Sequence, residues 1–244
     1  MGGVLLVLMG LSLAFTAVAQ ATSTNSLRWN VNGAALGEGE TATITAQAEG
    51  TQVFKGNPTV LIECSKLELL GGKLVGSKSL VPGKAEGRIS YSGCVLQPYA
   101  CIVTGVSKPL VATNAYLTKA AAEKEEIAAG LNGMLLAPKE GEVFVEFVVS
   151  KPKSGFCPPE KPITLPFTGN VLARVAKGSK ETVYNEEAQT HVIEGSTQKT
   201  YFENEGGKTV EHSGVGLKTG AMEASWSGKV GLSVAAGSKF NLAL

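Results

Sequence analysis

Hydrophobic and polar residues alternate over short stretches of this chain, and Gly, Pro and Asn separate the stretches. The pattern is clear at 41–46, where Thr41, Thr43 and Thr45 alternate with small or aliphatic residues. Because successive side chains of a strand point to opposite faces, a period of two predicts a β-strand with one buried face. Comparable runs predict further strands at 29–31, 59–63, 88–92, 101–104, 111–116, 143–149, 163–168, 171–175, 198–202, 222–226 and 229–234.

Two segments carry a more specific signal. The run at 143–149 reads VFVEFVV and is apolar on nearly both faces, which is typical of a central strand covered on both sides. Asn32-Gly33 follows the first predicted strand directly. Both residues tolerate positive φ, so the pair favours the type I′ turn of a hairpin.

One segment departs from the strand pattern. Residues 118–129 read TKAAAEKEEIAA, with Thr118 placed to cap a helix and Gly130 placed to end it. The apolar face of this segment is thin, so we expect a short exposed helix over one end of the sheet. The whole pattern predicts an all-β fold, an antiparallel β-sandwich or barrel, with this one helix.

The N-terminal segment is typical of a secretory signal peptide. Residues 4–18 form an apolar run, and the small-x-small patterns that follow it at 17–19 and 19–21 suit signal cleavage. No Lys or Arg precedes the run, which leaves open a start upstream of Met1. We expect residues 1–21 to be removed and 22–244 to form a single secreted β domain, with a soft boundary near 176–183 where the chain becomes more polar.

Composition narrows the function classes. The chain has 244 residues, is 43% hydrophobic and carries a net charge of +1, which excludes a disordered chain and disfavours nucleic-acid binding. It contains no Asp, so all 21 acidic residues are Glu. This excludes Ser-His-Asp triads, aspartic dyads and EF-hand loops.

The cysteines Cys64, Cys94, Cys101 and Cys157 form an even set in a chain with an export signal. Exported proteins meet an oxidising compartment, so we expect two disulfides rather than a metal site, for which the spacings lack a C-x-x-C step. We predict that Cys64 pairs with Cys94 and Cys101 with Cys157, because Cys64 and Cys94 end two apolar strands that can lie side by side. The competing pairing of Cys94 with Cys101 would close a tight loop of the kind that inhibitors present.

Other candidate chemistry is weak. Residues 165–169 read LPFTG and match the LPxTG pattern of sortase substrates, but they lie far from the C-terminus and lack the basic tail of a sorting signal. His191 and His212 each have a Glu nearby, but in strands their spacing does not suit a zinc site, so we expect surface histidines. We therefore expect no catalytic, cofactor-binding or metal-binding residues, and no cofactor. The aromatic residues that could stack on a sugar, most of which we expect in the core, are Trp29, Tyr99, Tyr201 and Trp226.

The order of several short motifs resembles a large, paralogue-rich group of secreted four-cysteine β proteins from soil actinobacteria. The resemblance covers about residues 29–240 and implies an exported, all-β protein, with no known catalytic or ligand residues to carry over. The motifs are WNVNG at 29–33 with GE at 39–40, LIEC at 61–64, YSGC at 91–94, YLTK at 116–119, VFVE at 143–146, YFENEGG at 201–207 and SWSG at 225–228.

The leading functional hypothesis is a non-enzymatic, secreted extracellular β module that acts in binding or as a cell-surface structural protein. Its partner is not identified by the sequence, and a cell-wall glycan or another surface protein are the candidates. We expect no nucleic acid and no membrane contact once the leader is removed. The alternatives are a Glu-dependent glycan hydrolase, which needs two glutamates in a cleft, and a protease inhibitor that presents a Cys94–Cys101 loop.

Overall fold

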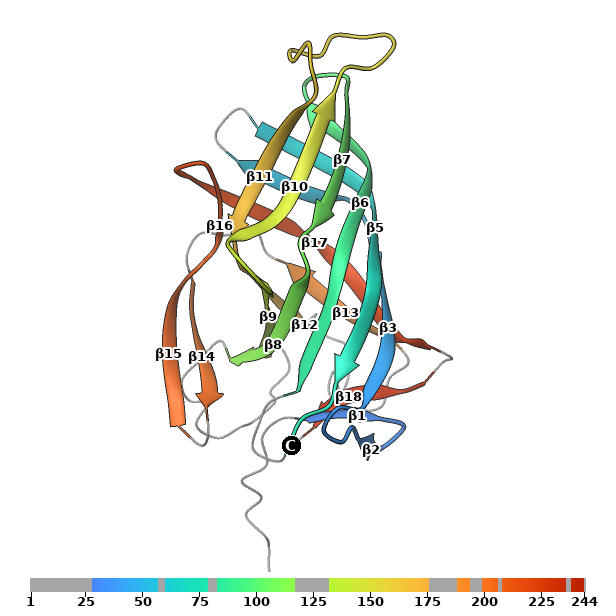
Figure 1. The fold of residues 1–244 in the computed structure, drawn as a ribbon, viewed down its shortest axis with the longest axis vertical. Helices are drawn as coiled ribbons and strands as arrows, with labels where there is room; N and C mark the ends of the chain where they lie inside the picture. Colours follow the sequence, from blue (N-terminus) through green and yellow to red (C-terminus); the bar gives the residue numbers. More distant parts are fainter. Residues whose placement is uncertain are drawn as a thin grey trace, which may run out of the picture.

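Every regular element in the described part of the chain is a β-strand (Figure 1). The computed structural model describes residues 28–56, 60–78, 83–116, 132–175, 188–193, 199–205, 208–235 and 238–243. The predicted all-β, antiparallel architecture is confirmed. The expected leader at 1–21, helix at 118–129 and soft boundary at 176–183 lie outside the described residues.

The strands of the described segments are numbered in chain order. They are β1 (Arg28–Val31), β2 (Ala34–Ala35), β3 (Thr41–Ala48), β4 (Gln52–Gly56), β5 (Val60–Val75), β6 (Lys84–Gln97), β7 (Cys101–Ser107), β8 (Leu110–Tyr116), β9 (Asn132–Pro138), β10 (Val143–Ser150), β11 (Ile163–Gly169), β12 (Val171–Val175), β13 (Ala188–Ile193), β14 (Lys199–Glu205), β15 (Lys208–Val215), β16 (Leu217–Thr219), β17 (Met222–Val234) and β18 (Phe240–Ala243).

Three long strands, β5, β6 and β17, are shared by two closed rings of strands. The first half of β5 pairs with β4 and its second half with β3. Likewise β6 pairs first with β8 and then with β7, while β17 pairs with β16 and β4 and then with β13 and β3. The long strands therefore run through both rings, and ten of the shorter strands divide between them. Strands β14 and β15 extend the sheet outward from β8, and β1, β2 and β18 form a separate sheet.

The two rings are stacked end to end (Figure 1). The upper ring follows the order β4-β5-β6-β7-β10-β11-β16-β17 and closes where β17 pairs with β4. The lower ring follows β3-β5-β6-β8-β9-β12-β13-β17 and closes where β17 pairs with β3. Of the two predicted arrangements, the strands thus form the barrel-like one, with each described ring built from eight antiparallel strands.

Several elements predicted from the sequence are present in the structure. The β1–β2 hairpin turns at Asn32 and Gly33 with φ of 52° and 81°, as the Asn-Gly signal predicts. The predicted central strand is β10, which pairs with β7 on one side and β11 on the other. Strand β7 alternates strictly between buried and exposed residues, so a period of two does identify one buried face.

Two predicted strands are shorter than the observed ones. The strand predicted at 59–63 continues to Val75, past a bulge between Leu70 and Lys73 where Gly71 has a φ of 61°. The strands predicted at 222–226 and 229–234 are one strand, β17, because Gly228 does not break it. A Cβ at Gly228 would collide with the side-chain amide of Gln52, so this glycine allows a close approach rather than a turn.

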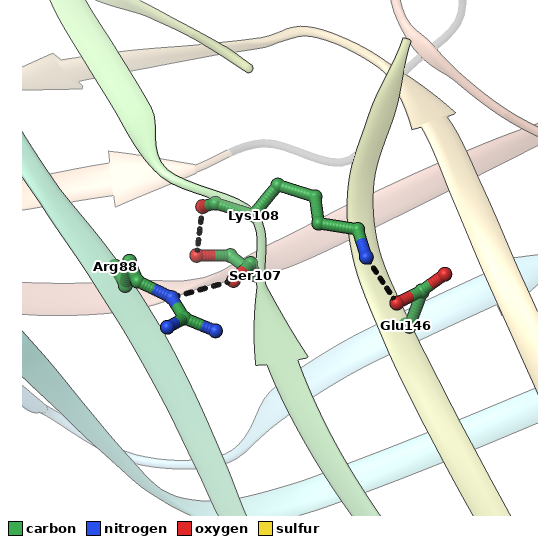
Figure 2. Close-up of polar contacts among 4 residues, drawn as sticks. All are labelled: Arg88, Ser107, Lys108 and Glu146. Carbon is green, nitrogen blue, oxygen red and sulfur yellow. Dashed lines mark hydrogen bonds and ion pairs between the residues drawn. The ribbon is translucent and has the colours of Figure 1, made fainter. Parts of the chain in front are cut away.

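The chain passes from the upper to the lower ring between β7 and β8, at a polar junction (Figure 2). The Ser107 hydroxyl, which is buried, accepts a hydrogen bond from the Ile89 amide at 2.7 Å and donates to the Lys108 carbonyl at 2.8 Å. The Arg88 Nε donates to the Ser107 carbonyl at 3.4 Å, and the Lys108 Nζ lies 2.6 Å from a Glu146 carboxylate oxygen. These side chains replace ladder hydrogen bonds that are lost where the strand changes rings.

The upper ring is filled with aromatic side chains. Phe54 stacks on Trp226 with ring centroids 5.4 Å apart, and its edge contacts with Tyr91 and Phe147 are 5.0 and 4.8 Å. Burial raises the pKa of the Tyr91 hydroxyl well above its ordinary value. The aromatic residues that fill this ring, each exposed by 2% or less, are Phe54, Tyr91, Phe144, Phe147, Phe167 and Trp226.

Candidate functional site

An apolar cavity occupies the interior of the lower ring. Its walls come from strands on all sides of the ring, and the empty space, including the part open to solvent, is about 620 Å³. Alanine and glycine supply much of the wall, and most of the other lining residues are aliphatic. The small lining residues are Ala46, Ala85, Gly87, Ala112 and Ala173.

The cavity follows from which side chains point inward. A ring of eight strands is just wide enough for side chains to fill it or for one small ligand to fit. The upper and lower rings both have eight strands, but the upper ring is filled by Phe, Tyr and Trp while the lower ring turns alanines to its axis. Ala85, Ala112 and Ala173 are each 8% exposed or less, so they are true interior positions. Space therefore remains only in the lower ring.

The upper end of the cavity is closed by the Trp226 indole. The indole Nε1 donates a hydrogen bond to the Gln52 side-chain oxygen at 3.1 Å. The Gln52 Nε2 donates in turn to the carbonyls of Lys229 and Gly50 at 2.9 and 3.2 Å. Gln52 is fully buried, and these hydrogen bonds hold the Trp226 indole in place between the upper and lower rings of strands.

The lower end is closed by a small separate sheet of order β18-β1-β2, which lies at the bottom of the molecule (Figure 1). Trp29 and Phe240, 6.4 Å apart, pack from this sheet against inner residues of the ring such as Leu74 and Met134. The Trp29 Nε1 donates to the Lys84 carbonyl at 3.0 Å, so the sheet is also tied to the ring by a polar contact. We refer to this three-stranded sheet as the plug.

Glu86 is the only ionisable residue among the described residues that line the cavity. The Lys73 Nζ lies 3.1 Å from one of its carboxylate oxygens and the Lys139 Nζ 3.6 Å from the other. The hydrogen bond from Lys73 lowers the pKa of Glu86 below its usual value of 4.5, against the opposing effect of desolvation. A general acid needs a raised pKa and a second carboxylate nearby, so this wall does not provide the pair that a glycan hydrolase requires.

The predicted cysteine pairing is confirmed. Cys64 and Cys94 occupy facing positions on β5 and β6 and are bonded, and Cys101 is bonded to Cys157. Because Cys94 is bonded to Cys64, the tight Cys94–Cys101 loop does not form. The inhibitor alternative, which needed that loop, is therefore wrong.

The LPFTG sequence and the histidines also have clear places. LPFTG lies within β11, where it pairs with β10 and, at Thr168 and Gly169, with β16. Phe167 at its centre is fully buried, which is unsuitable for a sortase. His191 lies on β13, which is not a neighbour of the β15 strand that carries His212. The His212 ring stacks on Tyr201 at 4.8 Å and its Nε2 lies 3.1 Å from Glu203. Within the described residues no three metal-ligating side chains gather.

Of the four aromatic residues that the sequence offered for stacking on a sugar, three are buried. Trp29 is in the plug, Trp226 closes the cavity, and Tyr201 packs against the outer face of the lower ring. Tyr99 is half-buried at the upper end of the molecule beside Phe156. No buried cleft therefore presents a row of aromatic faces in the described segments.

The cavity itself is not predicted from the sequence. Its four alanines lie on four different strands, and nothing in their local sequence says that they line one cavity. A usable signal is the contrast in size between inward positions, because β4, β10 and β11 of the upper ring carry buried Phe whereas β8 and β12 of the lower ring carry buried Ala.

Comparison with known proteins identifies no relative. No protein-family model, no curated protein and no solved structure matches the chain. In the described part of the chain, no helix has the length and apolar character needed to span a membrane. The geometry of the cavity is therefore the basis for a functional assignment.

Proposed function

We propose that this protein is a secreted, non-enzymatic binding protein that holds one small apolar molecule inside the lower ring. The observation that carries the proposal is the apolar cavity between Trp226 and the plug. Ligand sites in proteins are typically concave and mostly apolar. Closed rings of eight strands hold small ligands in several known classes of protein.

The lining defines the class of ligand. Because Glu86 is already paired with two lysines and the other walls are apolar, a bound molecule finds few hydrogen-bonding groups. A polar ligand would lose its hydration without compensation, which costs several kcal/mol for each unpaired group. The ligand is therefore a hydrocarbon-rich molecule, such as a short acyl chain or an apolar ring system.

Export is part of this proposal. Two disulfides, which persist in oxidising compartments, support it, as does the leader-like sequence at 1–21. The resemblance to secreted actinobacterial proteins supports the same assignment. Peptide mass spectrometry on the secreted protein, without reduction, is the test. A mature chain that starts near Gln20 or Thr22 is expected, whereas an intact leader on the secreted protein would contradict export through this signal.

The binding proposal is tested with N-phenyl-1-naphthylamine, an uncharged dye that fluoresces in apolar surroundings. We expect saturable binding with one dye per chain. Ala112→Leu and Ala173→Leu add volume to the cavity wall on β8 and β12, the two strands that flank β9, and are expected to weaken binding by at least about tenfold, which is about 1.4 kcal/mol. The dye affinity is measured by fluorescence titration, and circular dichroism checks that each variant is folded.

The matched control is Ala137→Leu. Ala137 lies on β9 next to the cavity-lining Leu136, but it is not part of the cavity wall, so the same added volume points away from the site. Its dye affinity is expected to match that of the unchanged protein. Equal affinities for all three variants, or no saturable binding by the folded protein, would rule out the cavity as a binding site.

A further inference from the structure

A second surface of the molecule, at the far end from the plug, carries features that the cavity does not explain. The loop between β10 and β11, residues 151–162, projects beyond the upper ring at the top of the molecule (Figure 1). We refer to it as the tip loop. It is fastened to the neighbouring β6–β7 turn by the Cys101–Cys157 disulfide and by a hydrogen bond from the Ala100 amide to the Phe156 carbonyl at 3.1 Å.

Phe156 presents its ring to solvent from this loop. It is 73% exposed, more than any other large hydrophobic side chain in the described part of the chain. The next residue, Cys157, is 4% exposed and disulfide-bonded, so the backbone beside Phe156 is anchored to the upper ring. The Phe156 ring lies beside the Tyr99 ring, with centroids 5.9 Å apart. The exposure is therefore built into an anchored loop.

Exposed aliphatic residues continue this apolar surface onto the strands below. Val95 and Ile102 are directly paired across β6 and β7, and Val148 lies on the adjacent β10. All lie within two residues of the upper end of their strand. Their exposed fractions are 40%, 52% and 41%, and Ile163 at the start of β11 is also 41% exposed. We refer to these four residues, Val95, Ile102, Val148 and Ile163, as the upper rim.

The tip loop also carries positive charge. Lys151, Lys153 and Lys161 are all exposed, and Glu160 is the single acidic residue of the loop. The lysines lie on both sides of Phe156 in the sequence. An exposed aromatic ring flanked by lysines matches the boundary of an anionic lipid layer, where acyl chains adjoin negatively charged headgroups.

We propose that the tip loop and the upper rim dock this protein onto the surface of an anionic lipid bilayer. Phe156 enters the acyl region, the aliphatic rim residues lie at the interface, and the three lysines contact lipid phosphates. This is contact with one face of the bilayer, and it adds a membrane partner that the sequence had not predicted. The expectation of no membrane contact considered only long apolar runs, whereas this surface is assembled from two hairpin ends, 95–102 and 148–163, that are far apart in the sequence.

The shape and chemistry of the surface favour lipid over a glycan or a protein. Phe156 offers a flat face to a sugar ring, but the aliphatic rim residues around it offer none of the hydrogen bonds that binding to a glycan also needs. Protein–protein interfaces usually have a polar rim that forms hydrogen bonds. Here the exposed Phe156 is instead surrounded by aliphatic side chains and by lysines. A fluid bilayer accepts such a convex projection without a matching pocket.

The test is co-sedimentation of the disulfide-bonded protein with vesicles. One set contains phosphatidylcholine alone and the other equal amounts of phosphatidylcholine and phosphatidylglycerol. We expect at least about tenfold stronger partition to the anionic vesicles, and a loss of that advantage at high salt. Phe156→Glu is expected to reduce partition by at least about tenfold, and Lys151→Glu with Lys153→Glu to remove the preference for anionic lipid.

Leu70→Glu is the matched control. Leu70 is 41% exposed but lies on β5 in the lower ring, so the same change in charge there should leave partition unaltered. The idea fails if the folded protein binds neither kind of vesicle, or if Phe156→Glu and Leu70→Glu behave alike. A dimer in vesicle-free solution that Phe156→Glu dissociates would instead assign the surface to a second copy of the chain. Dye binding in the lower ring should survive Phe156→Glu, so this proposal and the cavity proposal fail separately.

Discussion

Gln52 shows how a single side chain joins the two halves of the molecule. It lies at the start of β4, in the upper ring, yet its amide bonds to the Lys229 carbonyl on β17 and to the Trp226 indole. A fully buried amide is costly unless its donors and acceptor are satisfied, and three hydrogen bonds satisfy this one. The same contacts hold Trp226 as the upper wall of the cavity.

Replacing Gln52 by Leu is expected to destabilise the protein by about 2–4 kcal/mol. The change keeps the volume but leaves the Trp226 N–H and two backbone carbonyls without their partner, and each unsatisfied buried group costs about 1–3 kcal/mol. Urea denaturation measures the free energy of unfolding. Gln47→Leu, on the exposed face of β3, is the control and should stay within about 0.5 kcal/mol of the unchanged protein. A neutral Gln52→Leu would show that the hydrogen bonds contribute nothing.

Glu86 gives a pH dependence with a definite sign. Because Lys73 lowers its pKa in the folded state, the ionised form of Glu86 stabilises the fold above its usual pKa of 4.5. That contribution is lost as the pH falls from 4.5 through the lower, folded-state pKa. The difference in urea midpoint between the unchanged protein and Glu86→Gln should therefore shrink as the pH is lowered from about 6 to about 3. Glu68→Gln, exposed on β5, is the control, and the same pH trend for both variants would contradict a specific role of Lys73.

At the scale of elements, the two disulfides act at different places. Cys64–Cys94 joins strands that are already paired, whereas Cys101–Cys157 fastens the tip loop to the β6–β7 turn. Both half-cystines of the second bridge are buried, and β7 and β10 pair with each other just below it. The bridge therefore determines where the tip loop lies relative to the upper rim.

Removing the Cys101–Cys157 bridge by changing both residues to Ala is expected to cost about 4 kcal/mol of unfolding free energy. The bridge spans 56 residues, and the loss follows from the extra freedom of the unfolded chain in the loop-entropy model. Denaturant unfolding is the measurement. The tip loop loses its anchor in this variant, so partition to anionic vesicles should also fall. Stability unchanged to within about 1 kcal/mol would contradict the expected contribution of this bridge.

In the whole molecule, the upper half is filled with side chains, whereas the lower half contains a cavity. Aromatic packing fills the upper ring, and the cavity and the plug occupy the lower ring. The tip surface and the plug lie at opposite ends (Figure 1). If the tip docks on a bilayer, the lower ring and its plug face away from that surface.

Hydrogen exchange is expected to separate the two rings. N-phenyl-1-naphthylamine bound in the cavity stabilises only states in which the lower ring is closed, so β8, β9 and β12 should exchange more slowly with the dye present. At a free dye concentration about 100 times the Kd the slowing approaches about 100-fold. Exchange in β7, β10 and β11 of the upper ring should change little at positions that open locally. Equal slowing of local exchange in both rings would contradict a site confined to the lower ring.

Much of the fold follows from local patterns. The alternation at 41–46, the Asn32-Gly33 turn and the apolar run at 143–149 predict β3, the first hairpin and the central strand β10. The strands predicted at 222–226 and 229–234 are one strand because Gly228 permits a close approach, and such a glycine has the same local signature as one that permits a turn. The strand predicted at 59–63 is too short, since β5 continues to Val75.

By itself, the sequence determined the all-β class and the antiparallel strands, because these depend on a period of two and on turn residues, and it favoured the disulfide pairing that the structure has over the competing Cys94–Cys101 pairing. Only the tertiary structure decided that long strands are shared by two rings, that alanines from separate strands leave a cavity, and that Phe156 stands beside exposed aliphatic residues. Those features depend on which distant segments meet. The order of residues determines the periodicity within one strand, whereas the closure of the rings determines which strands lie next to it.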